Sequence, residues 1–201
     1  MNEEIDHVLS FWFSGGTQAV TRWFRPPAGF DEEVRTSFLP LISQARSHEL
    51  DSWTDTPLGS LALIILLDQF PRNVYRGSDG AHASDAQACS VATNAIARGY
   101  DHQVDDLQAL FFYMPLMHDE RLVSQVACVA QMETLYARCQ QKENAEAREA
   151  REFVEQGLKS AKGHRDTILK FGRFPSRNKI LGRESTEEEK KFLEENPSGF
   201  L

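Results

Sequence analysis

Two stretches of the chain share the order Phe-Pro followed by Arg-Asn. The first is Phe70–Asn73, and the second is Phe174–Asn178, in which a serine separates the proline from the arginine. An arginine guanidinium presents a planar set of hydrogen-bond donors that suits a carboxylate or a phosphate. If the two stretches meet in space, Arg72 and Arg177 form an anion pocket. The predicted ligand-binding residues are Arg72, Asn73, Arg173, Arg177, Asn178 and Arg183.

Each of these residues also has a local structural interpretation. The asparagines follow a proline, where we expect the chain to have left the helix, and an asparagine side chain fits a turn because it can bond nearby backbone groups. Arg183 precedes a final helix, whose N-terminus would favour an oxyanion. Arg183 is equally compatible with a solvated side chain beside a helix cap.

Asp68 is the most informative single residue. It follows the apolar run Leu61–Leu67, which we expect to form a helix buried on every side. A buried carboxylate must be paired or shift its pKa upward, and the candidate partners are Arg72, Arg173 and Arg177. An ion pair between Asp68 and one of these arginines has two interpretations. It is either a structural contact that holds the helix end to the C-terminal tail, or part of a site in which Asp68 orients an arginine or acts as a base.

His118 and His164 are the candidates for proton transfer, together with Asp68. A lone histidine next to apolar residues is more often structural than catalytic, so both interpretations stay open. These three residues could also bind a divalent metal, but no HExxH pair or other tight ligand spacing is present, and we predict no metal. The other histidines are expected at the surface: His7, His48, His82 and His102.

Several classes of function are disfavoured. The chain has no Gly-x-Ser-x-Gly elbow, dinucleotide-binding glycine motif or P-loop, so we expect no cofactor and find little support for a serine nucleophile. The net charge of −8 without a basic stripe argues against nucleic acid as a partner. A local basic pocket in the arginine-rich tail remains compatible with this charge.

The cellular location is predicted to be cytoplasmic. The three cysteines are odd in number and lack metal-type spacing, which favours free thiols in a reducing compartment. The N-terminus has no apolar signal core, and the longest apolar run has seven residues, too few to cross a membrane. The oligomeric state cannot be read from the sequence, although an exposed aromatic N-terminal segment is compatible with a dimer.

Helical patterns cover most of the chain, and no alternating strand pattern is present. Asn2 is a predicted N-cap, and Thr56-Pro57 is a predicted start of the central helix, which we expect Pro71 to end. We expect Pro40 to kink or break another helix. Further helices are predicted from Ser84 or Asp85 to Arg98, at Asp106–Tyr113 ending near Pro115, at Glu120–Gln140, at Lys142–Lys162, and at Thr186–Glu195 with a Ser185/Glu188 capping box. These patterns predict stacked helical hairpins.

Three segments carry a family resemblance: Leu61–Gly77, Phe111–Glu120 and Phe171–Thr186. With the early aromatic residues, they resemble a large bacterial family of uncharacterised proteins, a domain of unknown function. The resemblance implies an all-α, tetratricopeptide-repeat-like right-handed superhelix. The chain departs from the family pattern at Ser176, where the family has histidine, and at His118–Glu120, where it has His-Ser-Glu-Asp, so no family role is carried over to Ser176 or to the acidic pair Asp119 and Glu120. We expect one domain over 1–201, with 171–201 as a tail packed on the central helix.

Three functional hypotheses follow. The first is a binding module, in which the arginines hold an anionic small molecule or an acidic peptide. The second is a hydrolase or lyase of an anionic metabolite, with Asp68 or His118 as general base; it requires a histidine close to the arginines. The third is a scaffold protein in which an internal arginine network locks the tail to the body.

Overall fold

The computed structural model describes residues 2–15, 19, 22–23, 25–143 and 145–196. Throughout these residues the regular structure is helical, and no β-strand occurs, so the all-α prediction is confirmed. The α-helices are α1 (Glu3–Phe13), α3 (Phe30–Arg46), α4 (Pro57–Ile64), α5 (Phe70–Val74), α6 (Asp85–Ala97), α7 (Asp106–His118), α8 (Leu122–Gln140), α9 (Ala145–Phe171) and α10 (Glu187–Glu195). The predicted loop from Gly15 to Gly29 lies partly outside the described residues.

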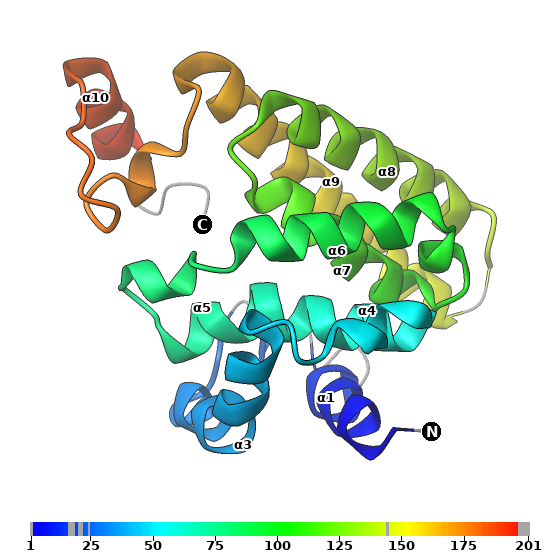
Figure 1. The fold of residues 1–201 in the computed structure, drawn as a ribbon. Coiled ribbons are helices and arrows are strands. Elements are labelled where there is room, and N and C mark those ends of the chain that lie inside the picture. The colour runs from blue at the N-terminus through cyan, green and yellow to red at the C-terminus, as the bar shows by residue number, and fades with distance from the viewer. Residues whose placement is uncertain (1, 16–18, 20–21, 24, 144, 197–201) are drawn as a thin grey trace.

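The helices stack in layers that follow the order of the chain (Figure 1). α1 and α3 lie against α4 and α5, α6 and α7 form the middle of the molecule, and the hairpin of α8 and α9 covers α7. Short 3-10 turns join several of the helices: η1 (Asp51–Asp55), η3 (Asp79–Ala81), η4 (Tyr100–His102) and η5 (Pro175–Arg177). α10 lies apart from this stack, beyond the end of α9 (Figure 1). None of the described helices is both long and apolar enough to span a membrane.

α4 is the centre of the core. Thr56 accepts a hydrogen bond from the Gly59 backbone N–H, and Pro57 occupies the first turn, as the Thr-Pro sequence predicts. The whole run Leu61–Leu67 has no exposed surface. Gly59 is required here, because a Cβ would come within 2.3 Å of the Trp53 carbonyl oxygen in η1. The apolar run is therefore enclosed on every side, as expected.

Three prolines show where the sequence pattern misleads. Pro71 does not end the central helix: a π-helical turn, η2 (Ile65–Gln69), follows α4, and the chain continues directly into α5. Arg72 and Asn73 therefore lie on a helix rather than beyond it. α3 runs without a break through Pro40, and α7 runs through Pro115 to His118. A proline removes a single helical hydrogen bond, and the almost complete burial of α5 and α7 compensates for that loss.

Other boundaries also differ from the prediction. Asn2 caps α1 as expected, with its side chain accepting from the Glu4 N–H. The capping box of α10 is made by Thr186 and Glu189, one residue later than predicted. α9 begins later than the predicted Lys142 and extends to Phe171. The one-residue shift at α10 reflects a choice between neighbouring capping residues, whereas α9 runs nine residues beyond the predicted Lys162.

Candidate functional site

A π-helical turn and a proline create the framework of the site. In η2 the Phe70 N–H bonds to the Ile65 carbonyl, five residues earlier, and such widened turns occur often at functional sites. Pro71 has no N–H to offer the Leu67 carbonyl four residues before it. The Ser84 hydroxyl donates to that carbonyl instead, at 2.8 Å. This bond holds the beginning of α6 against the π turn.

Asp68 lies in this turn with no exposed surface, and its carboxylate is fully engaged. One oxygen, Oδ1, is 2.7 Å from Nδ1 of His118 and 3.0 Å from a terminal nitrogen of Arg72. The other oxygen accepts from the side-chain amide of Gln69 at 2.5 Å. The Asp68 pairing predicted with Arg72 is therefore present, and His118, fifty residues away in the sequence, is an additional partner.

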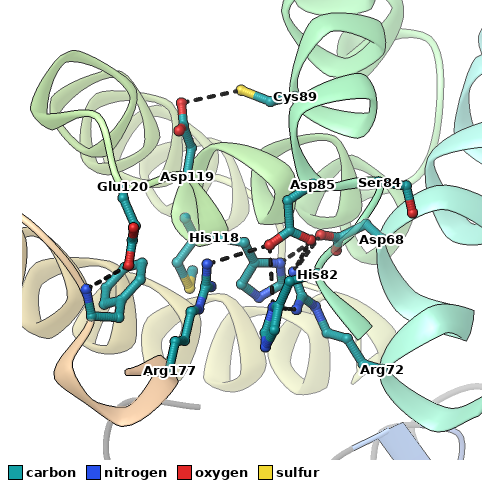
Figure 2. Close-up of polar contacts among 12 residues, drawn as sticks. Asp68, Arg72, His82, Ser84, Asp85, Cys89, His118, Asp119, Glu120 and Arg177 are labelled. Carbon is teal, nitrogen blue, oxygen red and sulfur yellow. Dashed lines mark hydrogen bonds and ion pairs between the residues drawn. The ribbon is translucent and has the colours of Figure 1, made fainter. Parts of the chain in front are cut away.

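Asp85, at the start of α6, is the second carboxylate of the site (Figure 2). It accepts from Arg72 at 2.8 Å and from Arg177 at 3.3 Å. His82 lies beside it, with Nδ1 at 3.3 Å from Asp85 and 3.0 Å from Arg72 Nη1. We call these six residues the polar cluster: Asp68, Arg72, His82, Asp85, His118 and Arg177.

The electrostatics of the pair at its centre favour a charged Asp68 and a neutral His118. Burial opposes ionisation of Asp68, but the positive charge of Arg72 and the hydrogen bonds from His118 and Arg72 outweigh it, and the pKa of the carboxyl lies below its usual range. For His118, burial and the Arg72 charge lower the pKa more than the Asp68 carboxylate raises it. At neutral pH an ionised Asp68 thus accepts a hydrogen bond from the Nδ1–H of an uncharged His118.

Arg177 reaches the polar cluster from the C-terminal segment. Burial and the nearby Arg72 charge lower its pKa to about 10, against the opposing effect of Asp85 and Glu120. Its guanidinium stacks over the ring of Phe174, 4.6 Å from the ring centre. Among the described side chains, its guanidinium donates a hydrogen bond to Asp85 alone. Arg177 therefore retains donor capacity beside a second positive charge.

The cluster is only partly closed to solvent. The side chains of Arg72, Asp85, His118 and Arg177 are 22%, 15%, 11% and 9% exposed, whereas Asp68 is at 0%. Asp68 is consequently an interior support, and the other four side chains retain some contact with water.

The rest of the C-terminal segment is held by separate ion pairs. Arg183 binds Glu120 through two contacts of 2.6 and 2.9 Å, and the Phe174 N–H donates to the same carboxylate. Arg173 makes a similar two-point contact with Glu189, and Asn178 also donates to Glu189. Together these bonds fix the loop that carries Arg177.

His164 lies near the cluster but is bonded elsewhere. It is buried, its Nδ1 is 2.9 Å from the Ser160 carbonyl oxygen, and its ring meets Phe174 edge-on at 5.4 Å. Burial, with the charges of Arg177 and Arg72, lowers its pKa to about 4. Its ring contact with Phe174 gives it a packing role next to the loop that carries Arg177.

The structure thus brings together only some of the residues that the sequence singled out. Arg72 and Arg177 meet at Asp85, with Asp68 and His118 next to them. Asn73 instead donates to Asp31, at 2.9 Å, and the predicted group of Arg173, Asn178 and Arg183 bonds to Glu189 and Glu120.

Sequence reasoning missed two members of the cluster, Asp85 and His82. The prediction that His82 lies at the surface is wrong, because its side chain is only 11% exposed. Its one sequence signal is its position three residues before Asp85, at the start of a predicted helix. Among the described residues, no group of three or more His, Cys, Asp and Glu side chains is arranged to hold a metal ion.

Comparison with known proteins places the whole chain in one family. The structure is similar to that of a protein of unknown function, ATU0120, from Agrobacterium tumefaciens, with 36% identity, a TM-score of 0.81, and coverage of 95% of this chain and 97% of the other. None of the curated proteins matches the sequence. A family model described as "Bacterial protein of unknown function (DUF924)" matches residues 8–197. Because that match spans nearly the entire sequence, including the whole polar cluster, the chain belongs to the DUF924 family of bacterial proteins.

Proposed function

We propose that the protein is an enzyme, a hydrolase or lyase of an anionic metabolite, with His118 as its general base. The observation that carries this proposal is the 2.7 Å contact between His118 Nδ1 and Asp68 Oδ1. A carboxylate at Nδ1 fixes the ring orientation and leaves the lone pair of a neutral imidazole on Nε2. A proton taken up at Nε2 would give an imidazolium that Asp68 stabilises.

The geometry favours His118 over Asp68 as the base. Asp68 has no exposed surface, both of its oxygens accept hydrogen bonds, and its pKa is held below the usual range. A carboxylate in that state has little tendency to accept a proton. His118 is 11% exposed at its side chain, and its lowered pKa keeps the Nε2 lone pair unprotonated at neutral pH. Asp68 serves as the group that orients it.

Arg72 and Arg177 supply the preference for an anion. Both guanidiniums contact Asp85, so two positive charges lie side by side at the edge of the cluster. An anionic group bound there would relieve their mutual repulsion, which already lowers the pKa of Arg177. Charge-assisted bonds from arginine also hold a substrate in a defined orientation. His118 would then remove a proton either from water or from the substrate itself.

The test is a turnover screen with matched variants. p-Nitrophenyl phosphate and mono-p-nitrophenyl succinate report hydrolysis, and ultraviolet absorbance of an unsaturated product from hydroxy acids reports elimination. In His118→Asn the amide nitrogen replaces Nδ1 and can still donate to Asp68, while the base at Nε2 is lost. We expect turnover to fall about 100- to 10,000-fold and the unfolding transition to stay in place. The control is His48→Asn, an exposed histidine; unchanged turnover in His118→Asn would refute the proposal.

A binding module without chemistry is the second candidate, favoured by the unused donors of Arg177. Its ligand would be an anionic small molecule or an acidic peptide. Thermal shifts with phosphate, carboxylates and acidic peptides separate the two candidates, since a ligand at a hundred times its dissociation constant adds about 2.7 kcal/mol. Binding that needs Arg177 but is unaffected by His118→Asn, without turnover of any substrate, supports this candidate. Arg165→Gln serves as the control, because Arg165 pairs with the adjacent Asp166.

A further inference from the structure

One ring nitrogen of His82 lies close both to a hydrogen-bond donor, Arg72, and to an acceptor, Asp85. Nδ1 is 3.0 Å from Arg72 Nη1 and 3.3 Å from Asp85 Oδ2. An arginine can only donate, whereas a carboxylate can only accept. Nδ1 cannot satisfy both as a neutral ring atom, so the two contacts imply different tautomers of His82.

The Arg72 contact decides the tautomer. It is the shorter of the two, and Asp85 Oδ2 already accepts from Arg177 while Oδ1 accepts from Arg72. An N–H on Nδ1 would point at a guanidinium that is always protonated. His82 Nδ1 is therefore an acceptor, and the ring proton lies on Nε2. No hydrogen bond joins His82 Nε2 to another residue in the part of the chain that the structure describes.

His118 has the opposite tautomer for the same kind of reason. Its Nδ1 faces the Asp68 carboxylate at 2.7 Å and must carry the proton. Its Nε2 consequently presents a lone pair. The guanidinium of Arg72 contacts His82 directly and also contacts Asp68, the partner of His118. The tautomers of both histidines therefore depend on groups that Arg72 holds in place. Both rings lie next to Arg72 (Figure 2), and the Nε2 of His118 thus offers an acceptor whereas the Nε2 of His82 offers a donor.

We propose that His82 is a further catalytic residue, which donates a hydrogen bond from Nε2 to an oxygen of the anionic substrate. This inference rests on the proposed function and extends it. A neutral imidazole can polarise a carbonyl or phosphoryl oxygen without giving up its proton. The substrate class is accordingly an anion whose carbonyl or phosphoryl oxygen gains negative charge during the reaction, while His118 accepts a proton.

The local fold holds His82 in a defined place. It ends the 3-10 turn η3, with its N–H bonded to the Asp79 carbonyl at 2.9 Å, and its own carbonyl accepts from the Asp85 N–H at 3.1 Å. Two residues later, the Ser84 hydroxyl fixes the chain to the Leu67 carbonyl. A preorganised donor of this kind requires no rearrangement when the charge develops.

The first experiment measures the tautomers directly, by long-range ¹H–¹⁵N correlation spectra of the histidine rings at neutral pH. We expect protonated Nε2 and unprotonated Nδ1 for His82, and the reverse for His118. His102 is the reference, because its Nδ1 also lies near an arginine, 3.2 Å from Arg138 Nη1, but on an exposed side chain outside the cluster. A proton on Nδ1 of His82, including a doubly protonated ring, overturns the inference.

The second experiment separates a catalytic donor from a structural acceptor. His82→Asn keeps an acceptor near Nδ1 for Arg72 but removes the distal donor, whereas His82→Gln keeps a donor near Nε2. Inorganic phosphate and acetate are titrated against both variants and against His102→Asn. We expect His82→Asn to weaken binding of the effective anion about tenfold or more, consistent with loss of one charge-assisted bond, and His82→Gln to retain most of it. Equal binding in wild type and His82→Asn, or a loss in His82→Gln alone, overturns the catalytic role.

Failure of this inference is distinguishable from failure of the proposed function. If the anions shift the His118 resonances and Arg177→Gln abolishes the shift, the anion site stands whatever His82→Asn does. If neither anion perturbs either histidine in the wild type, the anion site itself is refuted and the inference with it.

Discussion

The hydroxyl of Ser84 donates a hydrogen bond to the backbone carbonyl of Leu67, to which Pro71, four residues later, has no N–H to offer. Ser84 is the N-cap residue of α6, yet its side chain makes no cap hydrogen bond. The hydroxyl instead satisfies a buried carbonyl of another helix and accepts from Arg46 at 3.2 Å. Through this bond Ser84 holds the start of α6, with His82 and Asp85 on either side of it in the chain, next to the π turn that contains Asp68.

Removing this hydroxyl should destabilise both the fold and the cluster. We expect Ser84→Ala to lower the free energy of unfolding by about 1–3 kcal/mol, because a buried acceptor is left unsatisfied. Urea denaturation measures the loss, with the exposed Ser90→Ala in the same helix as the control. Pro71→Ala would restore a backbone donor, so the double variant should recover part of the stability. A double variant that loses the sum of both single effects would contradict the coupling.

Neutralising Asp68 should be among the most damaging substitutions in the chain. Asp68→Asn leaves the guanidinium of Arg72 without its fully buried counter-charge, and breaking a buried pair costs about 3–5 kcal/mol. Chemical denaturation at neutral pH provides the measurement. Asp51→Asn, at a site where the carboxylate is 59% exposed, should change the stability by less than about 0.5 kcal/mol. Similar losses of unfolding free energy in the two variants would show that Asp68 contributes no more to stability than an exposed carboxylate.

His164 predicts a pH dependence of stability. Its pKa falls from 6.5 to about 4 on folding, so between these values the unfolded chain binds more protons than the folded protein. Stability therefore rises with pH through this window and is lost as the pH falls from 6.5 towards 4, by roughly 3 kcal/mol. Urea denaturation of His164→Asn, which keeps a donor for the Ser160 carbonyl, should show a shallower loss. An unchanged slope relative to the wild type would assign the effect to other groups.

The contact between Glu120 and Arg183 should protect the C-terminal segment from proteolysis. Glu120 also accepts from the Phe174 N–H, so Glu120→Gln weakens two attachments of the loop that carries Arg177. We expect faster limited proteolysis between residues 172 and 186, and weaker anion binding through a displaced Arg177. Glu133→Gln, which breaks the exposed pair with Lys162, is the matched control. Equal cleavage rates in Glu120→Gln and wild type would show that other contacts hold the segment.

Asp68, the fully buried residue of the polar cluster, could be identified from the sequence because the pattern that indicates its burial is local. A carboxylate directly after seven apolar residues must be buried and paired, and Asp68 is both. The identity of its strongest partner was not accessible, since His118 is fifty positions away and is brought close by the packing of α7 against the π turn. Arg177 and Asp85 are separated by 92 positions, and no spacing rule connects them.

His82 and Asp85 escaped prediction for a different reason. His82 lies in a polar turn and Asp85 is the first residue of the helix that follows, a context in which most polar side chains are solvated. The Ser84–Leu67 bond, which lies between them in the chain, joins the start of α6 to the π turn through a long-range contact. The all-helical class could be predicted because it sums many weak periodic signals. The direction of the chain after Pro71 depended on a single compensated hydrogen bond, which the pattern of residues does not reveal.

The π turn at Ile65–Gln69 has a consequence for how this sequence can change. An α-helix advances about 100° per residue, so the wide turn adjusts the angular phase of everything that follows it. Deleting one residue there would leave an ordinary, well-formed helix in a still apolar environment. A π turn closes one residue later than an α-helical turn, so deleting Gln69 would leave Arg72 and Asn73 near their present positions but would change the place of Asp68 relative to Arg72 and His118. Variation in length at this turn could therefore separate folding from function more completely than any substitution within it.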